Sequence, residues 1–422
     1  MEFKKFDNKS INESYFHTVF NGLNVLVIPK KTFKSKYAIF GTKYGSVNNK
    51  FLFKNKNYNV PEGIAHFLEH KMFEKPSGDA FSRYAKTGAQ ANAYTSFDMT
   101  AYLFSCTENF YESLDILTDI VNTPWFTEET VKKEQGIIGR EIEMGLDNPG
   151  SRCFYNLMKC LYKNHPIRHD IAGSIESISK ITPELLYACF EAYYNPSNMV
   201  LCVCGDIEGQ RVLEILDKRM KTVVPEKVEN IYDEEPNEIN EPKKVMKAEV
   251  SIPQFQMGIK DNRTGLYGIE LSKHRIVTDM IIDAMVGRST PFYSKLYDEG
   301  LINGKFNGGS ICLQSCGFFE FTGESNNPYK VYDEIQKEII KFHETGITEE
   351  NFKRLKNKNY GFLLNVFDDT DDLANEYVSA FFDGINVFDM LQIYADLSLD
   401  DVNEELKYFD LNKMAISIVE PN

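Results

Sequence analysis

An internal repeat constrains the fold of this 422-residue chain more than any other feature of its sequence. Residues 126–148 (FTEETVKKEQGIIGREIEMGLDN) align without gaps on residues 347–369 (ITEENFKRLKNKNYGFLLNVFDD). In both copies a Thr and two Glu begin a helix, with Thr127 or Thr348 as the N-cap and the acids at the positive helix end. The chain therefore contains two copies of one structural unit.

A second match closes each copy and shows where the copies divide. Residues 195–207 and 410–422 share a polar turn, an Asn, a Met and a strand pattern. Between the copies, residues 225–244 (PEKVENIYDEEPNEINEPKK) are acidic and proline-punctuated, with too few apolar side chains to bury themselves. The repeat predicts an α+β protein with two homologous sheet-plus-helices domains, residues 1–224 and residues 245–422, joined by that linker.

The segment GIAHFLEHKMFEK at residues 63–75 carries the most specific chemical signal. Pro61 can begin a helix, and a helix places His66 and His70 one turn apart on one face, with Glu69 beside them. Two imidazoles so placed can chelate a Zn²⁺ ion, and the carboxylate can address its open coordination position. This is the reverse of the order in the known His-Glu-x-x-His zinc-binding helix.

The alternative is that these residues form an ordinary polar face of a helix. Against it, the helix is apolar almost all round, which is typical of a buried helix, and three ionisable groups there need partners. A catalytic zinc also needs a third protein ligand. Glu134 and Glu141, two turns apart in the first repeat, are candidates, although such a pair is also typical of a solvated face. Leu355 and Phe362 replace them in the second copy, so any chemistry belongs to the first.

A competing histidine pair, His165 and His169, lies in NHPIRHD. Pro166 moves His165 out of helical conformation, so the two rings need not share a face. A turn with hydrogen-bonded histidines is the alternative interpretation.

The eight cysteines lie in apolar surroundings without paired CxxC motifs, which favours buried structural thiols over disulfides or a zinc ribbon. Cys202 and Cys204, two residues apart on a strand, should share one face.

Charge and hydropathy exclude several partners. The chain has 47 Lys and Arg against 62 Asp and Glu, a formal charge of -15, so it lacks the basic balance that nucleic acids and anionic membranes require. The N-terminus has no signal-peptide apolar region, and no stretch approaches about 20 apolar residues. We expect a cytoplasmic protein with no nucleic-acid or membrane partner.

The segment AQANAYTSFDMTAYLF at residues 89–104 alternates strictly and predicts one long strand. One face carries Ala91, Ala93, Thr95, Phe97 and Met99; the other carries Asn92, Tyr94, Ser96 and Asp98.

These motifs together resemble the pitrilysin and insulinase superfamily of zinc peptidases, the inverted zincins that include the mitochondrial processing peptidases. The similarity runs along nearly the whole chain and is greatest to short bacterial members that often occur as paired, dissimilar chains. It rests on the residue 66–70 motif, GAQANAYTS at 88–96, the spacing of Glu134 and Glu141, DNPGS, NHPI with GSIESI at 173–178, and YYNPSNMVLCVCGD at 193–206.

The resemblance implies a role for each residue of the motif. His66, His70 and Glu141 would hold Zn²⁺, Glu69 would be the general base, and Glu134 would support the site from behind the ligands. Manganese or cobalt would suit the same ligands.

The resemblance also implies where a peptide substrate lies. The start of the 89–104 strand would be a sheet edge to which an extended peptide adds as a further strand. Ala91, Asn92, Ala93 and Tyr94 would therefore be the substrate-binding residues.

The sequence departs from the self-sufficient members of this superfamily in its second copy. Those members carry an Arg and a Tyr around a Gly-Leu step; aligning on Gly300-Leu301 puts Leu296 and Asn303 there instead. Residues that substitute if the alignment shifts are Tyr293, Lys295 and Tyr297. We expect the zinc-bearing subunit of a two-chain endopeptidase, completed by a homologous partner chain or a second copy. The alternatives are a non-catalytic peptide-binding scaffold and a zinc hydrolase of small amides.

Overall fold

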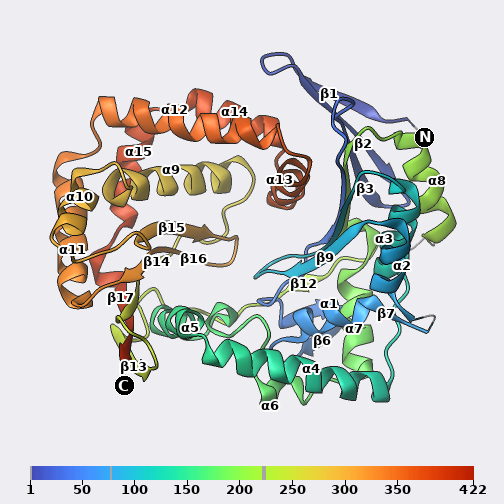
Figure 1. The fold of residues 1–422 in the computed structure, drawn as a ribbon, viewed down its shortest axis with the longest axis horizontal. Coiled ribbons are helices and arrows are strands. Elements are labelled where there is room, and N and C mark those ends of the chain that lie inside the picture. The colour runs from blue at the N-terminus through green and yellow to red at the C-terminus, as the bar shows by residue number, and fades with distance from the viewer. Residues whose placement is uncertain (1, 77, 221–224) are drawn as a thin grey trace.

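The computed structural model describes residues 2–76, 78–220 and 225–422, which form two sheets with helices around them (Figure 1). The larger sheet has the order β1-β2-β3-β11-β4-β10-β9. Its strands are β1 (Lys4–Asn8), β2 (Glu13–Phe20), β3 (Leu23–Pro29), β4 (Lys36–Thr42), β9 (Gln90–Thr95), β10 (Thr100–Cys106) and β11 (Met199–Gly205). The other sheet has the order β13-β17-β14-β16-β15. Its strands are β13 (Lys243–Ala248), β14 (Gln254–Asp261), β15 (Asn307–Cys312), β16 (Gly317–Glu324) and β17 (Met414–Pro421).

Two small sheets and the helices complete the described structure. The remaining strands are β5 (Lys50–Phe53), β6 (Lys56–Asn59), β7 (Glu74–Lys75), β8 (Gly78–Asp79) and β12 (Glu229–Asn230). Helices of the first half are α1 (Ile64–Phe73), α2 (Ala80–Thr87), α3 (Phe110–Asn122), α4 (Glu128–Asp147), α5 (Pro149–Leu161), α6 (Ile175–Ile178), α7 (Pro183–Tyr193) and α8 (Gly209–Arg219). Those of the second half are α9 (Ile269–Val286), α10 (Pro291–Asp298), α11 (Pro328–Thr345), α12 (Glu349–Val366), α13 (Thr370–Asp383), α14 (Val387–Asp396) and α15 (Leu399–Glu405). None of the described helices is both long and apolar enough to cross a bilayer.

The predicted α+β class with two related units is confirmed. Each half contains a mixed sheet whose last strand, β11 or β17, lies inside the sheet next to β4 or β14. The repeated helices begin as their sequences predict: Thr127 caps α4 by accepting from the Thr130 N–H, and Thr348 caps α12 by accepting from the Asn351 N–H. The local signals therefore fixed both helix starts correctly.

Helix α1 begins three residues later than Pro61 allows. Gly63 precedes it with a φ of 86°, a left-handed conformation that favours glycine. A Cβ on Gly63 would also lie 2.3 Å from the Ala172 carbonyl oxygen. Close packing on the segment before α6 thus sets the position of the helix.

The prediction of one long strand over residues 89–104 is wrong, because the chain folds there into the β9–β10 hairpin. At the turn the Ser96 N–H donates to the Met99 carbonyl at 2.7 Å, and the Ser96 hydroxyl donates to the same oxygen at 3.0 Å. The alternation continues through the turn, so periodicity alone does not reveal it. As a result β9 becomes the outer edge of the larger sheet.

The acidic segment expected as a linker is ordered along the surface. β12 pairs with β5, and Glu235 accepts from three consecutive backbone N–H groups, of residues 163–165, while pairing with Lys260 Nζ at 2.6 Å. Polar contacts, which a count of apolar residues does not detect, hold it in place. Lys243, inside the expected linker, already begins β13. The expected end of the first domain at residue 224 lies outside the described residues.

The two halves exchange one helix each. α5, from the first half, packs on β13, β14 and β17 of the second sheet, and α13, from the second half, packs on β4 and β11 of the first (Figure 1). Each helix directly follows the repeated helix of its own half, α4 or α12. The exchange is therefore part of the repeat.

One glycine in each sheet admits the exchanged helix. Gly41 pairs with Val200, the second residue of β11, and Gly258 pairs with Ala415, the second residue of β17, so the glycines occupy equivalent positions. A Cβ on Gly41 would lie 2.8 Å from Val378 of α13, and one on Gly258 would lie 3.0 Å from Leu157 of α5. Both strands need a bare backbone where the helix crosses.

The cores confirm the predictions for the cysteines. All eight are free and buried. Cys202 and Cys204 lie in a core shared with the second half, whereas Leu201 and Val203 of the same strand lie in the core under α1.

We expect Gly41→Ala and Gly258→Ala each to lower the free energy of unfolding by about 1–3 kcal/mol, because the added methyl group overpacks the exchanged-helix contact. Urea denaturation measures this. Gly309→Ala, in β15 with no atom within 4 Å of its Cβ, is the matched control and should change stability by about 0.5 kcal/mol or less. Equal effects at all three strand glycines would contradict the packing argument.

Candidate metal centre

Helix α1 and helix α4 bring three metal-binding side chains together. Glu141 Oε1 lies 3.5 Å from His66 Nε2, and Glu141 Oε2 lies 3.6 Å from His70 Nε2. The three residues offer one ligand atom each within 4.8 Å of one another. Ligands at about 2.1 Å from one tetrahedral zinc stand about 3.4 Å apart, so the triangle has the size that zinc requires. The contact between the two helices thus places Glu141, a candidate third ligand, beside both histidines.

Glu134 lies two helical turns before Glu141 on α4. It contacts one of the histidines but is not part of the triangle. Its Oε1 lies 3.1 Å from His70 Nδ1, and the residue is buried. A carboxylate on the far nitrogen of an imidazole orients the ring and leaves Nε2 for a metal.

The protonation of the two histidines differs. Burial, together with the nearby His70, lowers the pKa of His66 to about 4, so its ring is neutral and has a free lone pair. Burial also acts to lower the pKa of His70, but the hydrogen bond to Glu134 and the charges of Glu69 and Glu141 outweigh it and raise that pKa. The carboxylates around His70 thus make the site electronegative, as a cation site must be.

Glu69, next to His70 on α1, is not part of the triangle and contacts strand β9 instead. Its carboxylate is buried, which raises its pKa, and its Oε2 accepts a hydrogen bond from Thr95 Oγ1 at 3.0 Å. Thr95 is the last residue of β9. No sequence motif points to Thr95 as a site residue. Thr95 does share a strand face with Ala91 and Ala93, and those alanines pack toward the core that contains α1.

The four residues expected to bind substrate all lie in β9. Asn92 is exposed at the edge, and the Ala93 N–H donates to the Asn92 side chain at 2.9 Å instead of to a neighbouring strand. This N–H therefore points to the free edge. Tyr94 faces the other side of the sheet, where its hydroxyl donates to Asn375 of α13 at 3.1 Å.

The second histidine pair forms no metal group. His165 Nδ1 accepts from the Ile167 N–H at 3.2 Å and its ring stacks on Tyr232, while His169 Nε2 lies 3.6 Å from Glu62 Oε1. The alternative of a turn with hydrogen-bonded histidines describes this segment.

A second group of metal-binding side chains, Asp261, His274 and Cys312, is buried in the other half. Three distant segments supply it, so no local pattern could have revealed it. His274 contacts Asp261 Oδ2 through Nε2 at 2.6 Å and Glu405 Oε1 through Nδ1 at 2.5 Å. Burial opposes the charge, yet these hydrogen bonds raise its pKa to about 11. Carboxylates engage both ring nitrogens, so the group forms an ion-pair network.

Neither aligned residue of the second half reaches α1. Leu296 of α10 is fully buried, and Asn303 donates to Glu324 at 2.9 Å. Of the substitutes, Lys295 pairs with Glu334 at 2.6 Å and Tyr297 is exposed. α10 lies at the left end of the molecule in Figure 1, whereas α1 lies in its right half.

Comparisons with known proteins identify the family of the chain. The profile for insulinase (peptidase family M16) matches residues 54–174, and that for the peptidase M16 inactive domain matches residues 180–359. The chain is 38% identical over 412 residues, 96% of each chain, to YmfH of Bacillus subtilis, described as an uncharacterized zinc protease. It is 32% identical over 161 residues, 37% of this chain and 35% of the relative, to the mitochondrial-processing peptidase subunit beta of Caenorhabditis elegans.

Among solved structures, an M16-like peptidase from Alicyclobacillus acidocaldarius superposes with a TM-score of 0.93 at 32% identity, over 100% of this chain and 98% of that one. The duplicated fold is that of the M16 peptidases, a class whose B. subtilis relative is described as a zinc protease. The chain belongs to the insulinase family of peptidases, M16, and is related to the mitochondrial processing peptidases.

We expect His274→Gln to lower the free energy of unfolding by about 3–5 kcal/mol near pH 6, because it leaves the buried Asp261 carboxylate without its charged partner, while Glu405 keeps its ion pair with Arg263. The folded-state pKa of about 11 exceeds the ordinary 6.5, so the stabilisation is complete below pH 6.5 and disappears as the pH rises toward 11. The difference from wild type should therefore shrink between pH 6 and pH 10 in urea titrations.

The control for this variant is Lys273→Met, on the same helix as His274. It removes a half-exposed ion pair with Asp401 of α15 and should lower the free energy of unfolding by about 1 kcal/mol or less. A His274 effect that stays constant over this pH range would show that the residue is not held as a cation.

Proposed function

We propose that this chain is a zinc-dependent endopeptidase that hydrolyses extended peptides or unfolded segments, with His66, His70 and Glu141 as the metal ligands. One observation carries the proposal: a ligand triangle of zinc dimensions lies next to a buried carboxylate, Glu69, which is tied to the end of an edge strand by Thr95. A purely structural zinc would need no such base.

The chain's own residues divide the chemistry between them. A zinc ion bound here lowers the pKa of a water molecule and polarises a peptide carbonyl. Glu69 takes the proton of the attacking water and passes it to the departing amine nitrogen. Thr95 occupies Oε2, which leaves Oε1 for that proton. Glu134 keeps His70 in the orientation that presents Nε2.

The edge strand β9 provides the substrate-binding surface in this proposal. A peptide that adds alongside β9 replaces the Asn92 side chain as the partner of the Ala93 N–H. Strand addition selects extended chains, which favours peptides over small amides as substrates.

We further propose that a homologous chain, or a second copy, completes the substrate site. The support is that Leu296 and Asn303 stand where self-sufficient superfamily members have an Arg and a Tyr, and α10 lies far from α1. The nematode relative is itself named as a subunit.

Two other functions compete with this proposal. A peptide-binding scaffold would bind peptides without cutting them, and a small-amide hydrolase would cut short amides as fast as extended peptides. Cleavage of a quenched-peptide library, compared with small amides, separates all three.

We expect the wild type and Glu69→Gln each to bind one zinc per chain, whereas Glu141→Gln should bind zinc at least about 10-fold more weakly because it loses a charged ligand. Glu69→Gln should cleave peptides about 10²–10⁴-fold more slowly than wild type. Elemental analysis, zinc titration and peptide turnover measure these changes.

Glu143→Gln, exposed on the same helix, is the matched control for Glu141→Gln and should leave both properties unchanged. Equal zinc affinity in Glu141→Gln and wild type would remove Glu141 from the ligand set. Binding without cleavage under all conditions would identify a scaffold.

The partner proposal predicts that the zinc-loaded chain alone cleaves peptides slowly, and that a homologous chain carrying the Arg and Tyr raises kcat/KM by at least about tenfold, as expected for charged hydrogen bonds to the substrate. Mixing the purified chains and measuring initial rates tests this. A rate for the isolated chain equal to that of the mixture would show that it is self-sufficient.

A further inference from the structure

A cavity of about 690 Å³ is lined by residues of α4 that follow Glu141 in the sequence. Its rim includes Ile142, the residue after Glu141, and Glu62, two residues before α1. Gly145, also on the rim, lies one turn after Glu141 on the same face of α4, about 6 Å along the helix axis. An extended peptide advances about 3.4 Å per residue, so a residue within about three positions of the scissile bond can reach the cavity.

Three cations line the cavity, and two have no partner. Neither the Lys159 ammonium nor the Arg152 guanidinium has a hydrogen bond or ion pair with any residue that the structure describes. Lys244 has one contact, at 3.5 Å to Glu241. Burial lowers the pKa of Lys159, and the positive charges of Lys244 and Arg168 lower it further, although Asp170 opposes them. A half-buried lysine among cations is stabilised when an anion binds.

The acids of the cavity are engaged elsewhere. Glu176 pairs with Lys180 at 2.8 Å, Asp170 accepts from the Ala172 N–H at 2.9 Å, and Glu62 lies 3.6 Å from His169. None of them makes an ion pair with Lys159 or Arg152. The positive charge of these two groups is therefore left for a ligand.

The cavity lining is mixed, with apolar side chains among polar ones such as Ser151, Asn156 and Ser174. The apolar residues are Ile142, Leu146, Tyr155, Ile175 and Met246. Leu146 is 55% exposed and Ile175 is 49% exposed, so the lining is open to an incoming chain. Such a surface suits an aliphatic stem that ends in a charged group.

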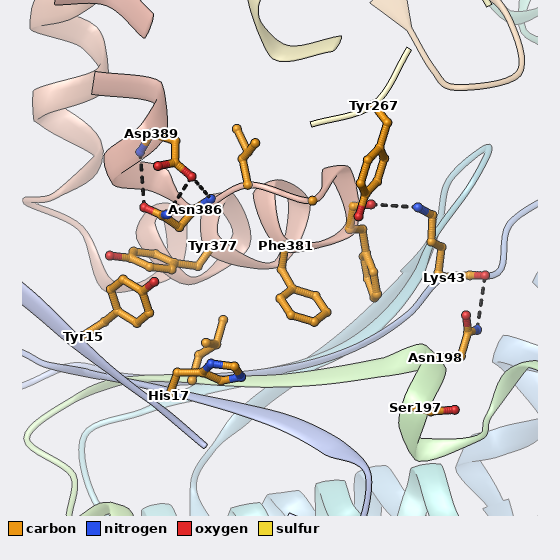
Figure 2. Close-up of a pocket in the computed structure, with 14 residues that line it drawn as sticks. Tyr15, His17, Lys43, Ser197, Asn198, Tyr267, Tyr377, Phe381, Asn386 and Asp389 are labelled. Atoms are coloured by element: carbon orange, nitrogen blue, oxygen red, sulfur yellow. Dashed lines mark hydrogen bonds between the residues drawn. The ribbon is translucent and has the colours of Figure 1, made fainter. Parts of the chain in front are cut away.

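A cavity on the other side of the larger sheet lacks this property. It has a volume of about 420 Å³ and lies between β2, β3 and α13 (Figure 2). Its lysine, Lys43, donates to the Phe382 carbonyl at 2.7 Å, and its acid, Asp389, accepts from Asn386 at 2.6 Å. Both charged groups already have polar partners there.

We propose that the cavity at Lys159 and Arg152 is a specificity subsite that binds a carboxylate of the peptide substrate. The carboxylate comes from an Asp or Glu side chain within about three residues of the scissile bond, or from the peptide's C-terminus. Arg152 can hold it through two parallel N–H donors, and Lys159 as a point charge. This subsite rests on the proposed peptidase function, since it names the substrates that the same site selects.

The test uses the full-length, zinc-loaded Glu69→Gln chain, which isolates binding from turnover. Fluorescence anisotropy compares a short neutral peptide with variants that carry one Glu, or the matched Gln, at each position around its centre. A further pair compares the free C-terminal acid with the amide. We expect one placement of the carboxylate to bind about tenfold more tightly than its neutral match, as a charge-assisted hydrogen bond gives.

Substitutions in the same background locate the effect. Lys159→Met and Arg152→Gln should each remove the carboxylate preference, and Lys159→Glu should reverse it in favour of a Lys-containing peptide. Lys132→Met, an exposed lysine of α4 outside the cavity, is the matched control and should keep the preference. Thermal unfolding of each variant confirms that it folds.

Either of two results would overturn the subsite. One is equal binding of charged and neutral peptides at every position and of the C-terminal acid and amide. The other is the same loss of preference in Lys132→Met as in Lys159→Met. Turnover by the wild type separates the two proposals. Cleavage without carboxylate preference supports the peptidase and removes the subsite. Carboxylate-selective binding without zinc-dependent cleavage, with the homologous partner chain also present, supports the carboxylate-binding cavity and removes the peptidase.

Discussion

The exchange of α5 and α13 between the two halves is the packing interaction on which the rest of the structure depends. Each sheet is covered on one face by a helix of the other half, and Gly41 and Gly258 allow the contact. The consequence reaches the metal centre because Asn148 both ends α4 and caps α5. The second half thereby anchors the end of α4. The apolar residues of α1 belong to the core of the first half, so the triangle with Glu141 depends on both halves.

The two halves share this architecture, but only the first has the candidate metal-binding residues on its helix. In each half a left-handed glycine and an isoleucine begin the helix beside the edge strand: Gly63 before α1, and Gly268 before α9. Counting from these glycines, Leu271 stands in the place of His66, and His274 in the place of Glu69. A buried ionisable group thus remains at the second position, where Asp261 and Glu405 neutralise it in an ion-pair network.

Local sequence signals predicted a large part of the fold and of the candidate site. N-caps fixed the starts of α4 and α12, and the four-residue spacing of His66 and His70 placed both rings on one helix face. What the sequence did not reveal depends on contacts between distant segments. The hairpin turn is hidden because alternation continues through Ser96, and the contact of Thr95 with Glu69 exists only once β9 lies against α1.

The exchange of α5 and α13 also affects how the two predicted domains can fold. Residues 1–224 and 245–422 describe the repeats, and we propose that they are not independent folding units. A fragment that ends near residue 224 would leave one face of the first sheet without α13, and α5 without β14 and β17. The apolar faces exposed in such a fragment would favour association over folding. Because Glu141 precedes α5 on the same continuous segment, such a fragment would also lose the anchor of its third proposed ligand, although all three ligand residues lie within it.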